Sequence, residues 1–258
     1  MWKKLVIVMT ATAAAAACND STGNQQFKSN VSVSFSTQSA APAPAPSFAI
    51  ATPSLAAFDD TLTSGIDTLI ITQAQLVLRK IELKQATSVN CDLVPEPPEC
   101  EDVELGPVLV DMPLTPGAQR KFSVALPMGT FTAIEFEIHK VSGDAEDQAF
   151  LQANPGFLDK SIRVTGTFNG QAFTFESDLD VEQTLVLIPA LVVGQAAATN
   201  VTIRVDISTW FVDQSGALVD PATANKGGQN ENVVKDNIKV SLKAFEDKDE
   251  DGDDSDEG

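Results

Sequence analysis

Four aspartates near the C-terminus have the types and spacing of calcium ligands. The run Asp247-Lys-Asp249-Glu-Asp251-Gly252 gives the D-x-D-x-D-G start of a calcium-binding loop. Oxygen ligands at alternate positions, with a glycine for the sharp turn, are what Ca²⁺ requires. The candidate ligands of this site are Asp247, Asp249, Asp251 and Asp253.

The same segment also fits a simpler interpretation. An EF-hand needs a bidentate Glu at its twelfth position, where this chain has Gly258, with Glu257 one residue short and no exit helix. Residues 246–257 hold nine acidic residues and one Lys, and blocks of like charge are usually solvated and disordered. The sequence therefore predicts either a weak calcium site or a disordered acidic tail over residues 247–258.

Catalytic machinery is not evident in the rest of the sequence. The only His is His139, and strand alternation places it on a wet face beside Glu135 and Glu137. The sequence contains no G-x-S-x-G, Walker or G-x-G-x-x-G motif. With 36 acidic residues, a carboxylate pair carries little information. We therefore expect His139 to be a surface residue and the domain to be non-enzymatic; the alternative is a secreted hydrolase that uses carboxylates.

The N-terminus has the features of an export signal. Lys3 and Lys4 precede a 13-residue uncharged run, Leu5 to Ala17, which is too short to span a bilayer. Ala15-Ala16-Ala17-Cys18 resembles a bacterial lipobox, in which the cysteine becomes the lipidated first residue. We expect a signal peptide over residues 1–17 and lipidation of Cys18. The alternative is ordinary cleavage that leaves Cys18 as an incidental thiol.

The other two cysteines are expected to form a disulfide. Export places Cys91 and Cys100 in an oxidising compartment. They bracket a proline-rich loop, and closing a ring of this length stabilises a fold by roughly 2–3 kcal/mol. Metal binding by two cysteines without a nearby His is the weaker interpretation.

Charge and composition exclude some partners. The 258 residues include 17 basic and 36 acidic ones, for a formal net charge of −19, and 43% are hydrophobic. An acidic chain without clustered Lys and Arg argues against nucleic-acid binding. We expect a membrane contact through the lipid anchor and an unknown protein or glycan ligand.

Alternating apolar residues predict strands along most of the chain. Residues 18–57 are expected to form a tether that contains a first strand candidate at 31–36, with its pairing left open. The sandwich domain should span 58–246. The predicted strands are 68–72, 74–84 with a bulge at Arg79-Lys80, 103–112, 121–126, 131–141, 161–168, 171–177, 184–188, 200–206 and 237–245, and residues 145–153 look helical.

Turn signals at this spacing predict an all-β fold. Asn169-Gly170 between two alternating runs is typical of a two-residue type I′ hairpin. We expect an antiparallel β-sandwich, Ig-like or transthyretin-like, with one short helix and disordered termini.

A long polar segment follows Trp210 and is the first place to expect a ligand. Long loops on rigid scaffolds carry function more often than strands do. Trp210 is either a recognition aromatic or, in the interpretation we favour, part of the core. The ligand-loop candidates are Trp210, Asp213, Asn225 and Asn230.

Three segments resemble uncharacterised secreted bacterial lipoproteins that have a β-sandwich domain of unknown function. The segments are Leu76-Val-Leu-Arg-Lys-Ile-Glu-Leu83, Val110-Asp-Met-Pro-Leu114 and Leu126-Pro-Met-Gly-Thr-Phe131. Phe131 stands where Tyr is common in those proteins. The resemblance implies a fold and a location in the bacterial cell envelope, and it implies no catalytic residues. We therefore expect an envelope lipoprotein with a non-enzymatic binding or structural domain; a further alternative is a calcium-responsive surface module.

Overall fold

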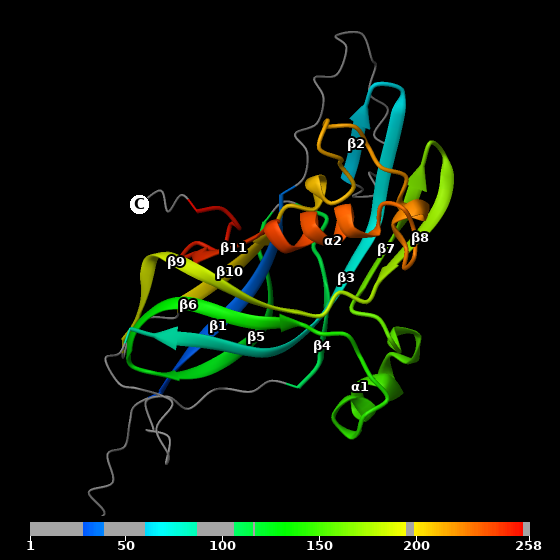
Figure 1. Cartoon of the computed structure of the whole chain (residues 1–258). Coiled ribbons are helices and arrows are strands. Elements are labelled where there is room, and N and C mark those ends of the chain that lie inside the picture. The colour runs from blue at the N-terminus through cyan, green and yellow to red at the C-terminus, as the bar shows by residue number, and fades with distance from the viewer. Residues whose placement is uncertain (1–27, 39–59, 87–105, 116, 195–198, 255–258) are drawn as a thin grey trace, which may run out of the picture.

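The computed structural model describes residues 28–38, 60–86, 106–115, 117–194 and 199–254. In these ranges the chain forms two β-sheets, with two short α-helices, α1 (Gln148–Ala153) and α2 (Glu231–Val240) (Figure 1). The strands are β1 (Lys28–Thr37), β2 (Asp60–Ser64), β3 (Asp67–Gln85), β4 (Val108–Asp111), β5 (Gln119–Pro127), β6 (Gly129–Ile138), β7 (Ile162–Phe168), β8 (Gln171–Ser177), β9 (Val181–Val193), β10 (Thr199–Val205) and β11 (Leu242–Glu246). The predicted all-β, two-sheet architecture is confirmed.

The smaller sheet has the strand order β11-β10-β1-β5. Its two central strands alternate strictly, and Val31, Val33 and Phe35 of β1 are fully buried, as are the apolar residues of β10. The pairing of residues 31–36, which the sequence left open, is thus settled: β1 is a central strand. It pairs antiparallel with β5 but parallel with β10, so the sheet is mixed where a purely antiparallel one was expected.

The larger sheet is organised around the long strand β3. Its strand order is β8-β7-β3-β6-β9, and β2 and β4 also pair with β3. The predicted bulge is present: the pairing of β3 with β6 shifts register between Arg79 and Glu82, and Lys80 has φ +53°. Because the bulge reverses the parity of the buried side chains, Leu78 and Ile81 are both fully buried.

The hairpin between β7 and β8 has the predicted turn. Asn169 and Gly170 have φ of +51° and +78°, as both central residues of a type I′ turn require. The pairing runs in register from Phe168↔Gln171 to Ile162↔Ser177.

The segment near residue 240 differs from the prediction. We expected one strand over 237–245 with Ile238, Val240 and Leu242 inward, but α2 ends at Val240 and the strand begins at Leu242. Val234 and Ile238 are fully buried, one helical turn apart, while Val240 is 79% exposed. The apolar residues of this segment therefore fit both the two-residue period of a strand and the 3.6-residue period of a helix, and the part before residue 241 forms the helix. The described residues form two α-helices where one was expected.

The two sheets share one hydrophobic core. Fully buried side chains from both sheets and from α2 belong to a single cluster. Trp210 and Phe211 lie inside it with no exposed surface, and Phe211 makes edge contacts with Phe173 and Phe175. Trp210 is thus a buried core residue, which is the interpretation favoured from the sequence. Within the described ranges, no helix is long and apolar enough to cross a bilayer.

Candidate functional site

The C-terminal acidic segment continues directly from the smaller sheet. Strand β11 pairs antiparallel with β10 up to Val201↔Glu246, and the amide of Asp247 then donates to Asn200 O at 3.0 Å. Beyond Asp247 the chain turns at Glu250 and Gly252, which have φ of +60° and +90°. One of the two expectations for residues 247–258 was a disordered tail, but residues 247–254 fold back against β10 and β1 (Figure 1, red). Residues 255–258 lie outside the described ranges.

The side chain of Asp247 is buried and binds both the sheet and the acidic segment. Its side chain is fully buried, and its Oδ2 accepts hydrogen bonds from Thr202 Oγ1 at 2.6 Å and from the Gly252 amide at 3.1 Å. Its Oδ1 is buried without a hydrogen-bond partner. Burial raises the pKa of the Asp247 carboxyl above its usual range, the bonds from Thr202 and Gly252 oppose this rise, and the neighbouring Asp249 carboxyl adds to it.

The structure brings together three of the four predicted calcium ligands. One carboxylate oxygen from each of Asp247, Asp249 and Asp251 lies within 4.8 Å of the other two. Asp249 and Asp251 are exposed, so the cluster opens to solvent. Asp253 is not part of the cluster; its amide donates to Asp251 Oδ1 at 2.9 Å.

A chain of buried hydrogen bonds holds Asp247 in place. Ser34 Oγ donates to Asn200 Oδ1 at 2.7 Å, Asn200 Nδ2 donates to Thr202 Oγ1 at 3.0 Å, and Thr202 donates to Asp247. In the same region Ser36 Oγ donates to Gly252 O at 2.9 Å. Each buried donor in this chain points to an acceptor, so the network fixes the orientation of the Asp247 carboxylate.

Gly252 brings the segment close to the sheet. A Cβ atom at this position would lie 2.8 Å from Ser36 Cβ and 2.9 Å from both Ala118 N and Gly117 C. Only glycine fits both this contact and the positive φ. The glycine of the D-x-D-x-D-G pattern is therefore needed for docking on the sheet as well as for the turn.

The chemistry of the acidic cluster suits a hard cation. Ca²⁺ takes six to eight oxygen ligands, of which three carboxylates supply part and backbone carbonyls and waters the rest. The nearby arginines contact other acids: Arg120 pairs with Glu250, and Arg204 lies 3.5 Å from Asp254. A buried carboxyl that has one oxygen without a partner and is clustered with two further carboxylates is a site where a bound cation would remove the cost of burial and of repulsion.

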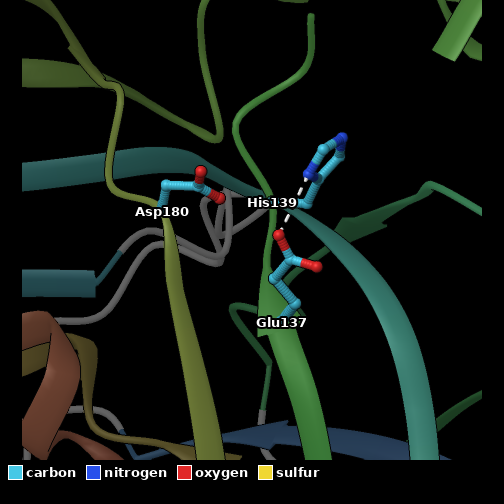
Figure 2. A group of neighbouring side chains, drawn as sticks. All are labelled: Glu137, His139 and Asp180. Carbon is cyan, nitrogen blue, oxygen red and sulfur yellow. Dashed lines mark ion pairs between the residues drawn. The ribbon is translucent and has the colours of Figure 1, made fainter.

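A second cluster lies at the end of β6 in the larger sheet (Figure 2). The antiparallel pairing of β6 and β9 ends at Ile138↔Val181. His139 directly follows β6 and Asp180 directly precedes β9, so the two residues lie next to the last pair of the ladder. Glu137 lies two residues before His139 and shares its face of the sheet. Single ligand atoms of Glu137, His139 and Asp180 all lie within 4.8 Å of one another.

His139 is buried, which corrects the expectation of a surface residue. It is 5% exposed, because the connection from residue 140 to 161, which contains α1, folds over the strand end. Phe150 and Phe157 of this connection pack on Val77 and Val141 in a small separate core. Alternation along β6 predicts the face of His139 correctly but carries no information about what covers that face.

Asp147 holds the imidazole of His139. The carboxylate of Asp147 is 1% exposed and lies 2.9 Å from His139 Nε2. It also accepts hydrogen bonds from the Ser142 amide at 2.6 Å and from Ser142 Oγ at 3.0 Å. Burial raises the pKa of Asp147, but the bonds from Ser142 and His139 outweigh it, and the pKa lies below its usual range.

The other imidazole nitrogen has no such partner. His139 Nδ1 lies 3.4 Å from Glu137 Oε1, as the dashed line in Figure 2 marks. This is an ion-pair distance, and the geometry does not make a hydrogen bond, so Nδ1 is buried without a hydrogen-bond partner. Arg79 binds both carboxylate oxygens of Glu137, with Nε 3.1 Å and Nη2 3.0 Å from Oε2 and Nη2 3.2 Å from Oε1.

The predicted ligand-loop residues make hydrogen bonds within their loop or to strand β8. Asp213 Oδ1 accepts the amides of Ser215 and Ala217, and Asn230 Nδ2 donates to Thr223 Oγ1 at 2.8 Å. Asn225 binds the edge of β8, where its Oδ1 accepts the Glu176 amide at 2.8 Å. Asp213 and Asn230 are thus used in hydrogen bonds within their own loop, and Asn225 is used in one that joins the loop to β8.

Several residues that matter for the acidic C-terminal cluster were not predicted. Thr202, Asn200, Ser34 and Ser36 lie on the strand faces that alternation predicts to be wet. The signal that could have identified them is the composition of this face in β1, where Ser32, Ser34 and Ser36 are all small and uncharged. Such a face suits contact with another segment. The cysteines Cys18, Cys91 and Cys100 lie outside the described residues.

Comparison with known protein families finds no match, and no curated protein matches the sequence. Among solved structures the chain is similar to MbnP from Methylosinus trichosporium, with a TM-score of 0.38 and 13% sequence identity, over 85% of this chain and 99% of that chain. The likeness is a distant one of fold. The resemblance to secreted bacterial lipoproteins stays a prediction.

Proposed function

We propose that this chain is an exported bacterial envelope lipoprotein whose non-enzymatic β-sandwich binds Ca²⁺ through its C-terminal loop. The observation that carries the calcium site is the buried carboxyl of Asp247, whose Oδ1 has no hydrogen-bond partner and which lies in one cluster with the carboxylates of Asp249 and Asp251. The oxygen-only ligand set favours a hard cation over a transition metal.

Calcium would act here by holding the acidic segment on the sheet. The loop is attached to the sheet through hydrogen bonds from Ser36 and Thr202 and through the ion pairs of Arg120 and Arg204, while the clustered carboxylates of Asp247, Asp249 and Asp251 repel one another. A cation that binds only the folded loop stabilises it by mass action. The segment is therefore ordered most strongly at the calcium concentrations found outside the cell.

Titration calorimetry of the purified full chain tests the calcium site. We expect one Ca²⁺ per chain and a melting temperature that rises with Ca²⁺. Asp249→Asn and Asp251→Asn should each weaken binding about tenfold or more, since each removes a ligand charge. Both residues are exposed, so neither variant disturbs the core. The matched control is Asp236→Asn, an exposed aspartate on α2 that should leave binding unchanged.

The absence of heat and of any melting shift at millimolar Ca²⁺ would show that the loop is a polar surface feature only. Equal affinities for Asp249→Asn and the control would place any binding elsewhere.

The anchor is tested separately by labelling cells with radioactive palmitate. We expect the wild type to be labelled and held in the membrane fraction, and Cys18→Ala to be unlabelled and released. A stable membrane attachment needs two acyl chains, which a lipidated N-terminal cysteine supplies. An unlabelled wild type would reject lipidation.

The ligand of the sandwich itself is tested by a pull-down from envelope extract. We propose a protein or glycan partner, bound without chemical conversion.

A further inference from the structure

We infer that Glu137, His139 and Asp180 form a second metal site, distinct from the calcium loop, that takes a divalent transition metal such as Zn²⁺. The site lies on the larger sheet, whereas the calcium loop lies on the smaller one. Its ligand set combines one imidazole with two carboxylates, which suits a borderline metal rather than Ca²⁺.

Asp147 determines the tautomer of His139. Asp147 is held as a carboxylate, so it only accepts hydrogen bonds, and Nε2 at 2.9 Å must donate to it. In the neutral ring Nδ1 is then unprotonated and presents its lone pair. A carboxylate that fixes one imidazole nitrogen while the other faces a cation is the usual second shell of a metal-binding histidine.

The groups around His139 Nδ1 favour a bound cation. Nδ1 lies 3.4 Å from Glu137 Oε1, which also accepts a hydrogen bond from Arg79 Nη2 at 3.2 Å. Asp180 supplies a further carboxylate, and single ligand atoms of Glu137, His139 and Asp180 all lie within 4.8 Å of one another. Arg79 supplies a donor to Glu137 but none to Nδ1, so the buried lone pair of Nδ1 stays uncompensated unless a cation binds it. Either a proton or a metal ion can supply that positive charge.

The distance between Nδ1 and Oε1 distinguishes a shared proton from a bound metal ion. A proton shared in a charge-assisted N–H···O bond brings nitrogen and oxygen to about 2.7–2.9 Å. Two ligands at about 2.0–2.1 Å from one tetrahedral metal lie about 3.3–3.4 Å apart. The 3.4 Å between Nδ1 and Oε1 matches the second case.

Charge and access also fit a divalent ion. The carboxylates of Glu137, Asp147 and Asp180 carry three negative charges, and Arg79 beside Glu137 supplies one positive charge. A divalent metal brings this group to neutrality, which lowers the cost of its partial burial. Asp180 is exposed, so the metal can enter from solvent and keep an open coordination position.

The test uses His139 as its own reporter, since it is the only His in the chain. The full chain, labelled with ¹⁵N in its imidazole, is titrated with Zn²⁺ in saturating Ca²⁺, which keeps the acidic loop occupied. We expect Nδ1 to shift on binding one equivalent while Nε2 keeps its proton. Asp180→Asn should weaken Zn²⁺ binding about tenfold or more, and Asp147→Asn about 10–100-fold.

Asp236→Asn is again the control and should bind Zn²⁺ as the wild type does. Asp180 is exposed, so loss of binding in Asp180→Asn with an unchanged melting temperature cannot come from misfolding. If His139 holds protons on both nitrogens at neutral pH and millimolar Zn²⁺ leaves its signals unchanged, the cluster is an ion pair and the inference is wrong. It is equally wrong if Asp180→Asn binds Zn²⁺ with unchanged affinity.

Discussion

The hydroxyl of Thr202 donates a hydrogen bond to Asp247 Oδ2 across 2.6 Å, and both side chains are fully buried. This contact joins the centre of the smaller sheet to the start of the acidic segment. Thr202 in turn accepts from Asn200, so its single proton has only Asp247 as an acceptor. The position of the first calcium ligand is therefore set by a strand residue 45 positions earlier in the chain.

Thr202→Val tests this contact with a side chain of nearly the same shape. The change leaves Asp247 Oδ2 with the Gly252 amide alone and leaves Asn200 Nδ2 without an acceptor. We expect a loss of about 1–3 kcal/mol in the free energy of unfolding, measured by urea denaturation without metal, together with weaker Ca²⁺ binding. Thr132→Val, at an exposed position of β6, should change stability by less than about 0.5 kcal/mol. Equal effects of the two changes would contradict the role of Thr202.

Gly252→Ala tests whether the acidic segment must touch the sheet in order to bind Ca²⁺. Gly252 and Gly216 have nearly the same φ, +90° and +82°, but a Cβ atom has open space only at Gly216. Both alanine variants carry the strain of a positive φ, about 1–2 kcal/mol. Only Gly252→Ala also meets backbone atoms of residues 117 and 118, which cannot move aside as a flexible side chain can.

We therefore expect Gly252→Ala to release the loop and to lower Ca²⁺ affinity by more than tenfold, about 1.4 kcal/mol. Gly216→Ala should keep the wild-type affinity, and calorimetry compares the two. A Gly252→Ala protein that binds Ca²⁺ normally would show that the cluster forms without docking on the sheet.

The fold could be predicted where a local pattern has one meaning. Asn169-Gly170 fixes the hairpin of β7 and β8, and the parity change at Arg79-Lys80 fixes the bulge in β3, because both are set by neighbours in the sequence. The prediction of a strand before Leu242 was wrong because the spacing of Ile238 fits a strand and a helix equally well. The parallel pairing of β1 with β10 joins residues far apart in sequence, for which periodicity carries no information.

The candidate sites could likewise be predicted only where their residues are close together in the sequence. The alternating aspartates at 247, 249 and 251 could be found from the sequence because a calcium loop is local. The burial of Asp247 depends on β1 and β10 and could not be found. Similarly, alternation places Glu137 and His139 on one face, but Asp180 joins them only through the pairing of β6 with β9.

Asp178 is expected to make the stability of the fold depend on pH in the acid range. Hydrogen bonds from Lys226 at 2.7 Å and Lys235 at 2.6 Å lower the pKa of Asp178 to about 2. Because the folded-state pKa is below that of the unfolded chain, the contribution to stability is complete above about pH 4. It is lost as the pH falls towards 2.

Asp178→Asn should therefore destabilise the fold by about 1–2 kcal/mol at neutral pH, after allowance for the exposure of Lys226. The difference from the wild type should shrink to near zero at about pH 2, measured by urea unfolding at several pH values. Asp236→Asn removes an exposed pair with Lys239 and should show little pH dependence. A difference for Asp178→Asn that stays constant from neutral pH to pH 2 would rule out the ion pairs as its cause.

Ser241→Ala should destabilise the junction between α2 and β11. Ser241 Oγ accepts the indole Nε1–H of Trp210 at 2.8 Å and donates to Ile238 O at 2.8 Å. Trp210 is fully buried, so alanine at 241 leaves its N–H without a partner, at a cost of about 1–3 kcal/mol. Ser123→Ala, at an exposed position of β5, is the matched control and should cost less than about 0.5 kcal/mol.

A double-mutant cycle with Trp210→Phe separates this hydrogen bond from packing. Trp210→Phe removes the donor and part of the buried ring, so it should be destabilising by itself. Once the donor is absent, Ser241→Ala should cost less than it does in the wild type, by about 0.5–3 kcal/mol of coupling. Costs that simply add would mean that Ser241 stabilises the junction only through Ile238 O, and that the Trp210 contact contributes nothing to it.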